Sequence, residues 1–204
     1  MDSPKDFLVA EYETLKEFRT SQVEQAQNRF NFFLILVSSA VGIVALVSDG
    51  QNSFDTPIFF IVVSLTALAL LYLGTVTLRR IIQTHIQTVR YTRGLNRIRR
   101  YFVQQFPEIE EYLTFSTDDR KPQFGAMGSL TIGITGLTGM VIFINATLAY
   151  IGISFLLQAL MKSVDHEYTL VSVLIGAVPF IGAILLQRRY LNSEVEKAKT
   201  KYDK

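Results

Sequence analysis

Four long runs of the chain contain no charged residue, and they constrain the fold more than any other feature. The runs are Phe30–Ser48, Pro57–Leu78, Gln123–Met161 and Tyr168–Gln187. An α-helix rises about 1.5 Å per residue, so a run such as Pro57–Leu78 is long enough to cross a hydrocarbon core of roughly 30 Å. We therefore expect an all-α membrane protein with four transmembrane helices.

The distribution of basic residues predicts how these helices are oriented. Of the 20 Lys and Arg residues, only Lys162 lies in one of the two short loops, and the others lie before the first run, between the second and third, or after the fourth. Loops rich in Lys and Arg stay in the cytoplasm. The pattern predicts a multi-pass protein of the cell inner membrane with both termini cytoplasmic.

The runs divide the chain into five expected segments. Residues 1–29 form a cytosolic amphipathic leader helix, and 30–78 hold the first two transmembrane helices. Residues 79–126 form a cytosolic basic helical extension and return loop. Residues 127–187 hold the third and fourth transmembrane helices, and 188–204 form a cytosolic tail. The leader and the extension together make a cytosolic helical collar.

Two of the expected helices are longer than their membrane spans. No residue breaks a helix between Pro4 and Val47, so the leader should continue directly into the first span. The second span should likewise continue into the basic extension until Pro107 stops it. The third run is longer than one crossing needs, and we expect its span at about Ser129–Ile153, with Pro122–Gly128 near the interface.

The extension has one basic and one apolar helical face. The apolar face, formed by Tyr91, Leu95, Ile98 and Phe102, should pack on the leader or on a neighbouring subunit. The basic face could pair with acidic residues of the leader or bind a phosphate-bearing ligand. A third interpretation applies to the arginines at span ends, Arg79, Arg80, Arg188 and Arg189, which could reach anionic headgroups of the inner leaflet. The leader's acidic residues are Asp6, Glu13, Glu17 and Glu24. The expected ligand-binding residues are Arg90, Arg93, Arg97 and Arg100, with Tyr91 and Tyr101 stacking on a base.

Small and polar residues form a stripe along the first span. They are Asn31, Ile35, Ser38, Gly42 and Ala45. Such stripes are usually contact surfaces between helices, because small residues let backbones approach closely in lipid. The more specific interpretation is that these residues line a pore. In the third run Asn145 should find a hydrogen-bond partner on another helix.

The residue types that most enzymes and ion-coupled transporters use are missing from the four runs. They contain no acid, base or histidine, whereas ion-coupled transporters place ionisable groups in the membrane. A channel does not need them. Arg80 and His85 have the R-x4-H spacing of HEPN ribonucleases, but that spacing alone is not specific. With no cysteine, phosphate-binding loop or metal-ligand cluster, we expect neither an enzyme nor a bound metal or cofactor.

Two stretches resemble a known group of proteins. The leader EYETLKEFRTSQVEQAQNRF and the extension RYTRGLNRIRRYF are similar to segments of SLATT-like and four-transmembrane bacterial membrane effectors of anti-phage defence. The resemblance implies a protein that permeabilises the inner membrane when a nucleotide second messenger is made. Four spans and a glycine-rich third run depart from the minimal two-span SLATT pattern.

These observations lead to one main hypothesis and two competitors. The main hypothesis is an oligomeric inner-membrane channel or membrane-disrupting effector, gated through its cytosolic helices by a nucleotide signal. Its partners would be the lipid bilayer, further copies of the chain, and a cyclic or linear oligonucleotide rather than duplex nucleic acid. The first competitor is a non-conducting membrane adaptor whose collar docks a soluble protein. The second is an uncoupled transporter of small molecules.

Overall fold

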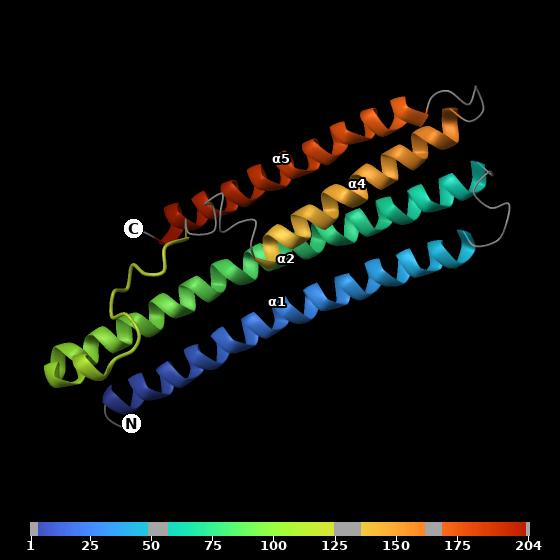
Figure 1. The fold of residues 1–204 in the computed structure, drawn as a ribbon. Coiled ribbons are helices and arrows are strands. Elements are labelled where there is room, and N and C mark those ends of the chain that lie inside the picture. The colour runs from blue at the N-terminus through green and yellow to red at the C-terminus, as the bar shows by residue number, and fades with distance from the viewer. Residues whose placement is uncertain (1–3, 49–56, 125–135, 162–168, 203–204) are drawn as a thin grey trace.

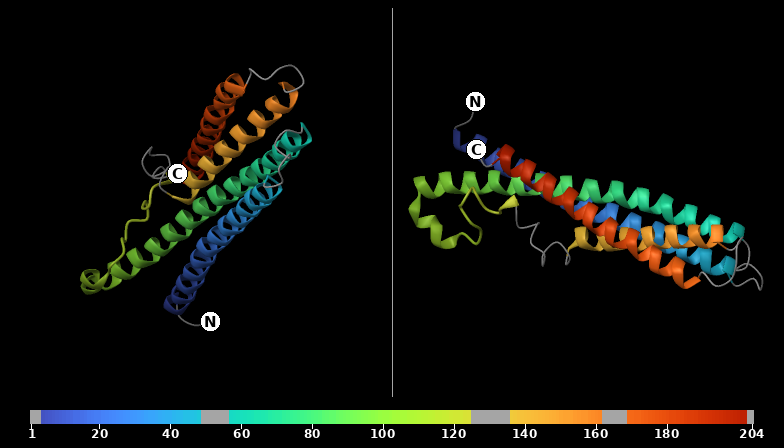
Figure 2. Two further views of the ribbon diagram at one scale, coloured as in Figure 1. Left: turned by 45° about the vertical axis from the view of Figure 1, so that its right-hand side comes forward. Right: turned by 90° about the horizontal axis from the view of Figure 1, so that it is seen from above.

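The computed structural model describes residues 4–48, 57–124, 136–161 and 169–202, and every regular element in these ranges is a helix. Helices α1 and α2 lie side by side, α4 packs on α2, and α5 packs on α4 (Figures 1 and 2). Both long helices α1 and α2 extend past α4 at one end of the bundle (Figure 1). The elements are α1 Pro4–Ser48, α2 Pro57–Gln105, the 3-10 helix η2 Pro107–Tyr112, α4 Leu137–Met161 and α5 Thr169–Tyr202.

The expected continuity of the two long helices is confirmed. Leader and first span form the single helix α1, and the second span and the basic extension form the 49-residue helix α2. Helix α2 ends just before Pro107, because a proline disfavours helical geometry in the preceding residue. Phe106 accordingly leaves the helical region, with φ −137° and ψ 78°. The polar ends of both helices are therefore rigidly joined to their apolar ends.

The expected limits of the third span need correction. Its predicted beginning at Ser129, together with most of the Pro122–Gly128 segment, lies outside the described residues. Helix α4 begins at Leu137 and continues past the predicted end at Ile153 to Met161. The uncharged run is uninterrupted up to Lys162, so no charged residue ends the helix earlier.

Three helices in the described ranges are long and apolar enough to cross a membrane. The qualifying segments are Lys5–Val47, Pro57–Gln105 and Leu137–Leu160. The protein is thus all-helical and compatible with a multi-pass membrane protein. Helix α5 lies beside α4, and its first half is apolar while its second half is polar (Figure 1).

Close packing joins α1, α2 and α4 around Gly74 of α2. A Cβ atom at this glycine would collide with the Asn145 side chain of α4 and would lie 2.7 Å from the ring of Phe33 of α1. Asn145 is fully buried and donates to the Oε1 atom of Gln187 on α5 at 3.3 Å, which confirms the expected partner across a helix interface. Further along the contact between α2 and α4, buried Ser64 donates to the carbonyl oxygen of Gly152 at 2.7 Å.

Candidate functional site, a basic cleft at the polar end

Residues 113–124, which we call the return segment, fold back along the basic face of α2. Two α2 side chains hold this segment by its backbone. Asn96, which is buried, donates to the carbonyl oxygens of Asp118 at 3.1 Å and Lys121 at 2.9 Å. Arg93 donates to those of Pro122 and Arg120, both at 3.1 Å. Two side chains on neighbouring turns of α2 therefore hold the backbone of the return segment against this helix.

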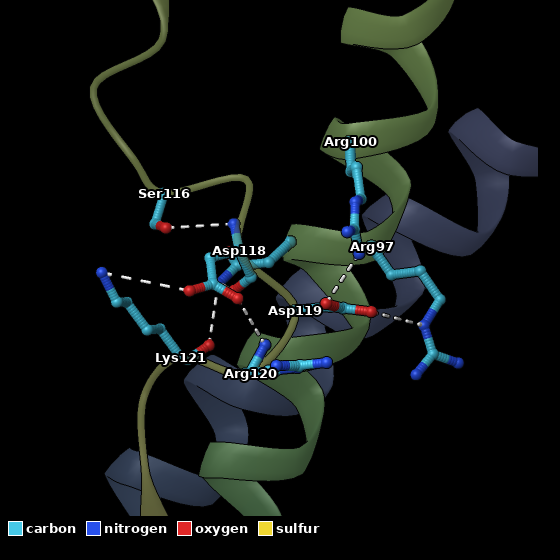
Figure 3. A network of polar contacts seen from close by, with 8 residues as sticks. Arg97, Arg100, Ser116, Asp118, Asp119, Arg120 and Lys121 are labelled. Carbon is cyan, nitrogen blue, oxygen red and sulfur yellow. Dashed lines mark hydrogen bonds and ion pairs between the residues drawn. The ribbon is translucent and has the colours of Figure 1, made fainter.

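A carboxylate of the return segment is placed between two arginines. Arg100 donates to Oδ1 of Asp119 at 2.8 Å, and Nε of Arg97 lies 3.8 Å from Oδ2 (Figure 3). The turn that presents Asp119 is stabilised by its neighbour Asp118, whose backbone N–H donates to Ser116 and whose carboxylate accepts from the N–H of Arg120. Asp119 therefore occupies the position that an external anion would take.

These groups line a cleft of about 800 Å³ between α2, the return segment and the end of α5. We call it the basic cleft, because five of its side chains are basic and one is acidic. The lining residues are Arg93, Arg97, Arg100, Asp119, Arg120, Gln123, Phe124, Lys199 and Tyr202. Several cations around one carboxylate create a positive potential that attracts anions.

The two arginines beside Asp119 stay accessible to solvent. The exposed fraction of the side chain is 77% for Arg97 and 51% for Arg100, against 24% for Asp119. Ion pairs this exposed contribute at most about 1 kcal/mol each. A phosphate group, which carries more charge and more acceptor oxygens than a carboxylate, is therefore able to compete with Asp119 for both guanidinium groups.

Two aromatic rings contribute to the lining of the cleft. Phe124, which is buried, stacks on Tyr202 with 5.8 Å between ring centroids, and the Arg93 guanidinium lies 4.2 Å from the Phe124 centroid. Arg90 lies 5.3 Å from the Tyr202 centroid. Phe124 and Arg90 therefore already contact the Tyr202 ring from within the protein.

No protein-family model, curated protein or solved structure matches this chain.

The structure gives the six predicted ligand residues different positions. Arg97 and Arg100 line the cleft with accessible guanidinium groups, whereas Arg93 lines it but holds the return segment. Arg90 is not in the cleft lining, and its guanidinium lies over the ring of Tyr202. Tyr91 stacks on Phe18 of α1 at 5.8 Å, and Tyr101 packs against Phe102, so neither tyrosine is in the cleft lining.

The leader contributes apolar packing to the basic extension. Phe18 and Leu15 of α1 contact Tyr91 and Gly94 of α2, as expected for the apolar face of the extension. In the described ranges, the ion pairs of Arg97 and Arg100 are formed with Asp119 and not with leader residues Glu13, Glu17 or Glu24. Asp119 thus takes the structural role that the sequence had suggested for the leader's acidic stripe.

The predicted stripe of the first span lies on an exposed face of α1. Asn31, Ile35, Ser38, Gly42 and Ala45 are all exposed, and a Cβ at Gly42 would meet no atom within 4 Å. This face is free to contact lipid, a second copy or a pore.

The two residues of the ribonuclease-like spacing are not brought into one cavity. Arg80 lines a polar pocket between α1, α2 and α5, whereas His85 lines a smaller and mainly apolar pocket beside Thr138 of α4. Burial lowers the pKa of His85 from its ordinary value of 6.5, so this imidazole is neutral near pH 7.

Sequence reasoning missed six lining residues of the cleft. They are Asp119, Arg120, Gln123, Phe124, Lys199 and Tyr202. Arg120 directly follows Asp118 and Asp119 in the loop between Pro107 and Pro122. This cluster of opposite charges was the sequence feature that could have indicated a contact with the basic face. Lys199 and Tyr202 belong to α5, and no local pattern connects the end of α5 to the basic face of α2.

Proposed function

We propose that this protein is an oligomeric inner-membrane channel or membrane-disrupting effector that a nucleotide signal gates through the basic cleft. Four helices cross the membrane in this proposal, with both termini and the cleft in the cytoplasm. The observation that carries it is the cleft itself, a cationic site of about 800 Å³ built directly on an extended helix. A ligand with several phosphates, such as a cyclic or linear oligonucleotide, fits its charge and its volume.

Helix α2 supplies the connection between ligand and membrane. Its 49 residues form one helix of about 70 Å that carries Arg97 and Arg100 near one end and the apolar segment Pro57–Leu78 at the other. The return segment leads along the chain to α4. A phosphate that replaces Asp119 on the two arginines removes one attachment of this segment to α2, while the backbone hydrogen bonds from Asn96 and Arg93 remain, and so changes the constraint between α2 and α4.

The exposed apolar surface supports an oligomer within a bilayer. Only 11% of the most apolar stretch of α1 is buried inside the single chain, so this helix needs lipid or further subunits around it. The stripe from Asn31 to Ala45 lies on that uncovered side. Small and polar residues there suit either helix contact between copies or a pore wall.

The binding step is tested with a fluorescent oligoadenylate and the detergent-purified protein. The double variant Arg97→Glu, Arg100→Glu should weaken binding by at least about 100-fold, because two charge-assisted contacts are lost and two repulsive ones are added. Arg93 is left unchanged, since it holds the return segment. The control Lys16→Glu, Arg19→Glu makes the same change of net charge on an exposed part of α1 and should bind like the wild type.

Equal binding by both double variants would refute the assignment of the cleft. Binding should also weaken as salt rises, because exposed phosphate contacts are screened. Salt-independent binding would equally contradict recognition through phosphates.

One observation favours the adaptor as a second candidate function. Large aromatic side chains are exposed at the far polar end of the long helices, among them Phe7 at 68%, Phe115 at 61% and Tyr112 at 79%. Exposed aromatic residues are typical of protein-binding surfaces. An adaptor would show no ionic current with or without nucleotide.

A further inference from the structure

A second basic pocket lies closer to the apolar part of the bundle, between α1, α2 and α5. Its volume is about 570 Å³. Its polar lining comes from Gln22, Gln25 and Arg29 of α1, Arg80, Gln83 and Gln87 of α2, and Glu194, Lys197, Lys201 and Tyr202 of α5. We call it the proximal pocket. It shares only Tyr202 with the basic cleft.

Most positive charges of the proximal pocket have no carboxylate partner. Its one acidic residue, Glu194, accepts from Lys197 at 2.6 Å. In the described ranges Arg29, Arg80 and Lys201 form no ion pair, and Nζ of Lys201 lies 5.3 Å from the centroid of the Tyr202 ring. Three helices therefore bring three unpaired cations to one cavity, an arrangement that an anion between them stabilises.

The position of the two arginines along their helices indicates which anion this is. Arg29 immediately precedes the apolar run that begins at Phe30, and Arg80 follows the run that ends at Leu78 by two positions. At about 1.5 Å per residue, both lie within roughly 3 Å of the hydrocarbon boundary. The polar headgroup layer outside that boundary is about 5–7 Å thick on each side. The lipid phosphates lie in this layer.

The rest of the lining matches a phospholipid headgroup. Guanidinium groups bind phosphate oxygens through two parallel hydrogen bonds. The glutamine amides of α1 and α2 can donate to phosphate and glycerol oxygens. The exposed apolar side chains of α1 provide a surface along which the acyl chains can lie, including Phe32 at 63% and Ile35 at 63%.

We propose that the proximal pocket binds the phosphate of an anionic phospholipid of the cytoplasmic leaflet. The bound headgroup links α1 and α2, through Arg29 and Arg80, at the level where the bundle leaves the membrane. The chemistry recognised is a phosphate ester, which a soluble phosphate would share. The depth of Arg29 and Arg80 assigns it to a lipid.

The test uses dioleoyl phosphatidylglycerol, added to delipidated protein in a neutral detergent, with thermal unfolding as the readout. Dioleoyl phosphatidylcholine serves as the zwitterionic control with the same acyl chains. The wild type should be stabilised by phosphatidylglycerol more than by phosphatidylcholine. In Arg80→Gln the phosphatidylglycerol concentration that gives half of the full stabilisation should rise about tenfold, because one charge-assisted hydrogen bond is lost.

Arg79→Gln is the matched control, because Arg79 lies at the same membrane level and carries the same charge but does not line the pocket. It should respond to phosphatidylglycerol like the wild type. Equal losses in Arg79→Gln and Arg80→Gln would show general attraction to an anionic surface and overturn the proposal. An unchanged response in Arg80→Gln would overturn it too. Circular dichroism of both variants without lipid establishes that they are folded.

Soluble phosphate esters separate the two sources of the ligand. Glycerol 3-phosphate and inorganic phosphate should give no comparable stabilisation. If either reproduces the effect with the same dependence on Arg80, the pocket takes a soluble anion and the lipid assignment fails. The response to phosphatidylglycerol should persist in Arg97→Glu, Arg100→Glu, so the result is independent of nucleotide binding in the basic cleft.

Discussion

Substitution of Gly74 by alanine tests the packing that joins the three central helices. Gly74 of α2 is buried, and the added Cβ would collide with Oδ1 of Asn145 and lie 2.9 Å from its Cγ. It would also lie 2.7 Å from Cζ of Phe33, a side chain that is only 1% exposed. Real Cβ atoms do not approach so closely. Either Asn145 must turn away from Gln187 or α4 must move off α2.

The size of the effect follows from three terms. Inserting a methyl group into a packed core costs about 1–3 kcal/mol. Losing the hydrogen bond between Asn145 and Gln187 adds about 0.6 kcal/mol, the average for such contacts inside membranes. Alanine gains up to about 1 kcal/mol over glycine in a helix. The net expectation is a loss of about 1–2 kcal/mol in the free energy of unfolding.

The assay is reversible unfolding in mixed micelles with increasing fraction of a denaturing detergent. Gly182→Ala is the control, because a Cβ at Gly182 of α5 would meet nothing within 4 Å. Gly182→Ala should be neutral or slightly stabilising. If the two variants differ by less than about 0.5 kcal/mol, the close approach of α1, α2 and α4 at Gly74 is refuted.

Three further predictions concern other parts of the molecule. Burial lowers the pKa of His85 in the folded state, so the unfolded state binds a proton first as the pH falls. The contribution of His85 to the free energy of unfolding should be complete above pH 6.5 and decrease below it. Thermal unfolding over a pH series should therefore show a flatter profile for His85→Gln than for the wild type. Asp119→Asn removes the internal competitor of Arg97 and Arg100, and should tighten oligoadenylate binding several-fold, measured by fluorescence anisotropy, while changing the unfolding free energy by less than about 1 kcal/mol. Gly42→Ala adds a Cβ that meets no atom of its own chain within 4 Å and should leave subunit unfolding unchanged, whereas cross-linking in membranes should show an altered pattern of oligomers if the stripe contacts another copy.

The long helices were predictable because their causes are local. An unbroken sequence of helix-compatible residues produces α1, and Pro107 sets the end of α2 whatever surrounds it. The apolar face of the extension was also predictable, because helical periodicity places Leu95 and Ile98 together and both are buried. The limits of the third span were not predictable from hydropathy, since its uncharged run is longer than one crossing needs.

The basic cleft could be predicted only in part. Spacing along one helix placed Arg93, Arg97 and Arg100 on the same face, but it does not reveal which partners that face meets. The partners are set by tertiary contacts, above all by the Asn96 side chain that fixes the return segment through two backbone carbonyls. Every residue has a backbone carbonyl, so the sequence does not indicate which carbonyls accept hydrogen bonds from Asn96. For the same reason Asp119 could not be distinguished from the leader's acidic residues as the counterion.

We propose that nucleotide binding in the basic cleft controls a conducting pore. The most direct test is single-channel current from the purified protein in planar bilayers, recorded before and after addition of cyclic and linear oligonucleotides. We predict discrete current steps whose open probability changes with one nucleotide class. That response should be absent in Arg97→Glu, Arg100→Glu and retained in Lys16→Glu, Arg19→Glu. Absence of current under every condition, from protein shown to be folded and oligomeric, would contradict the channel and favour the adaptor.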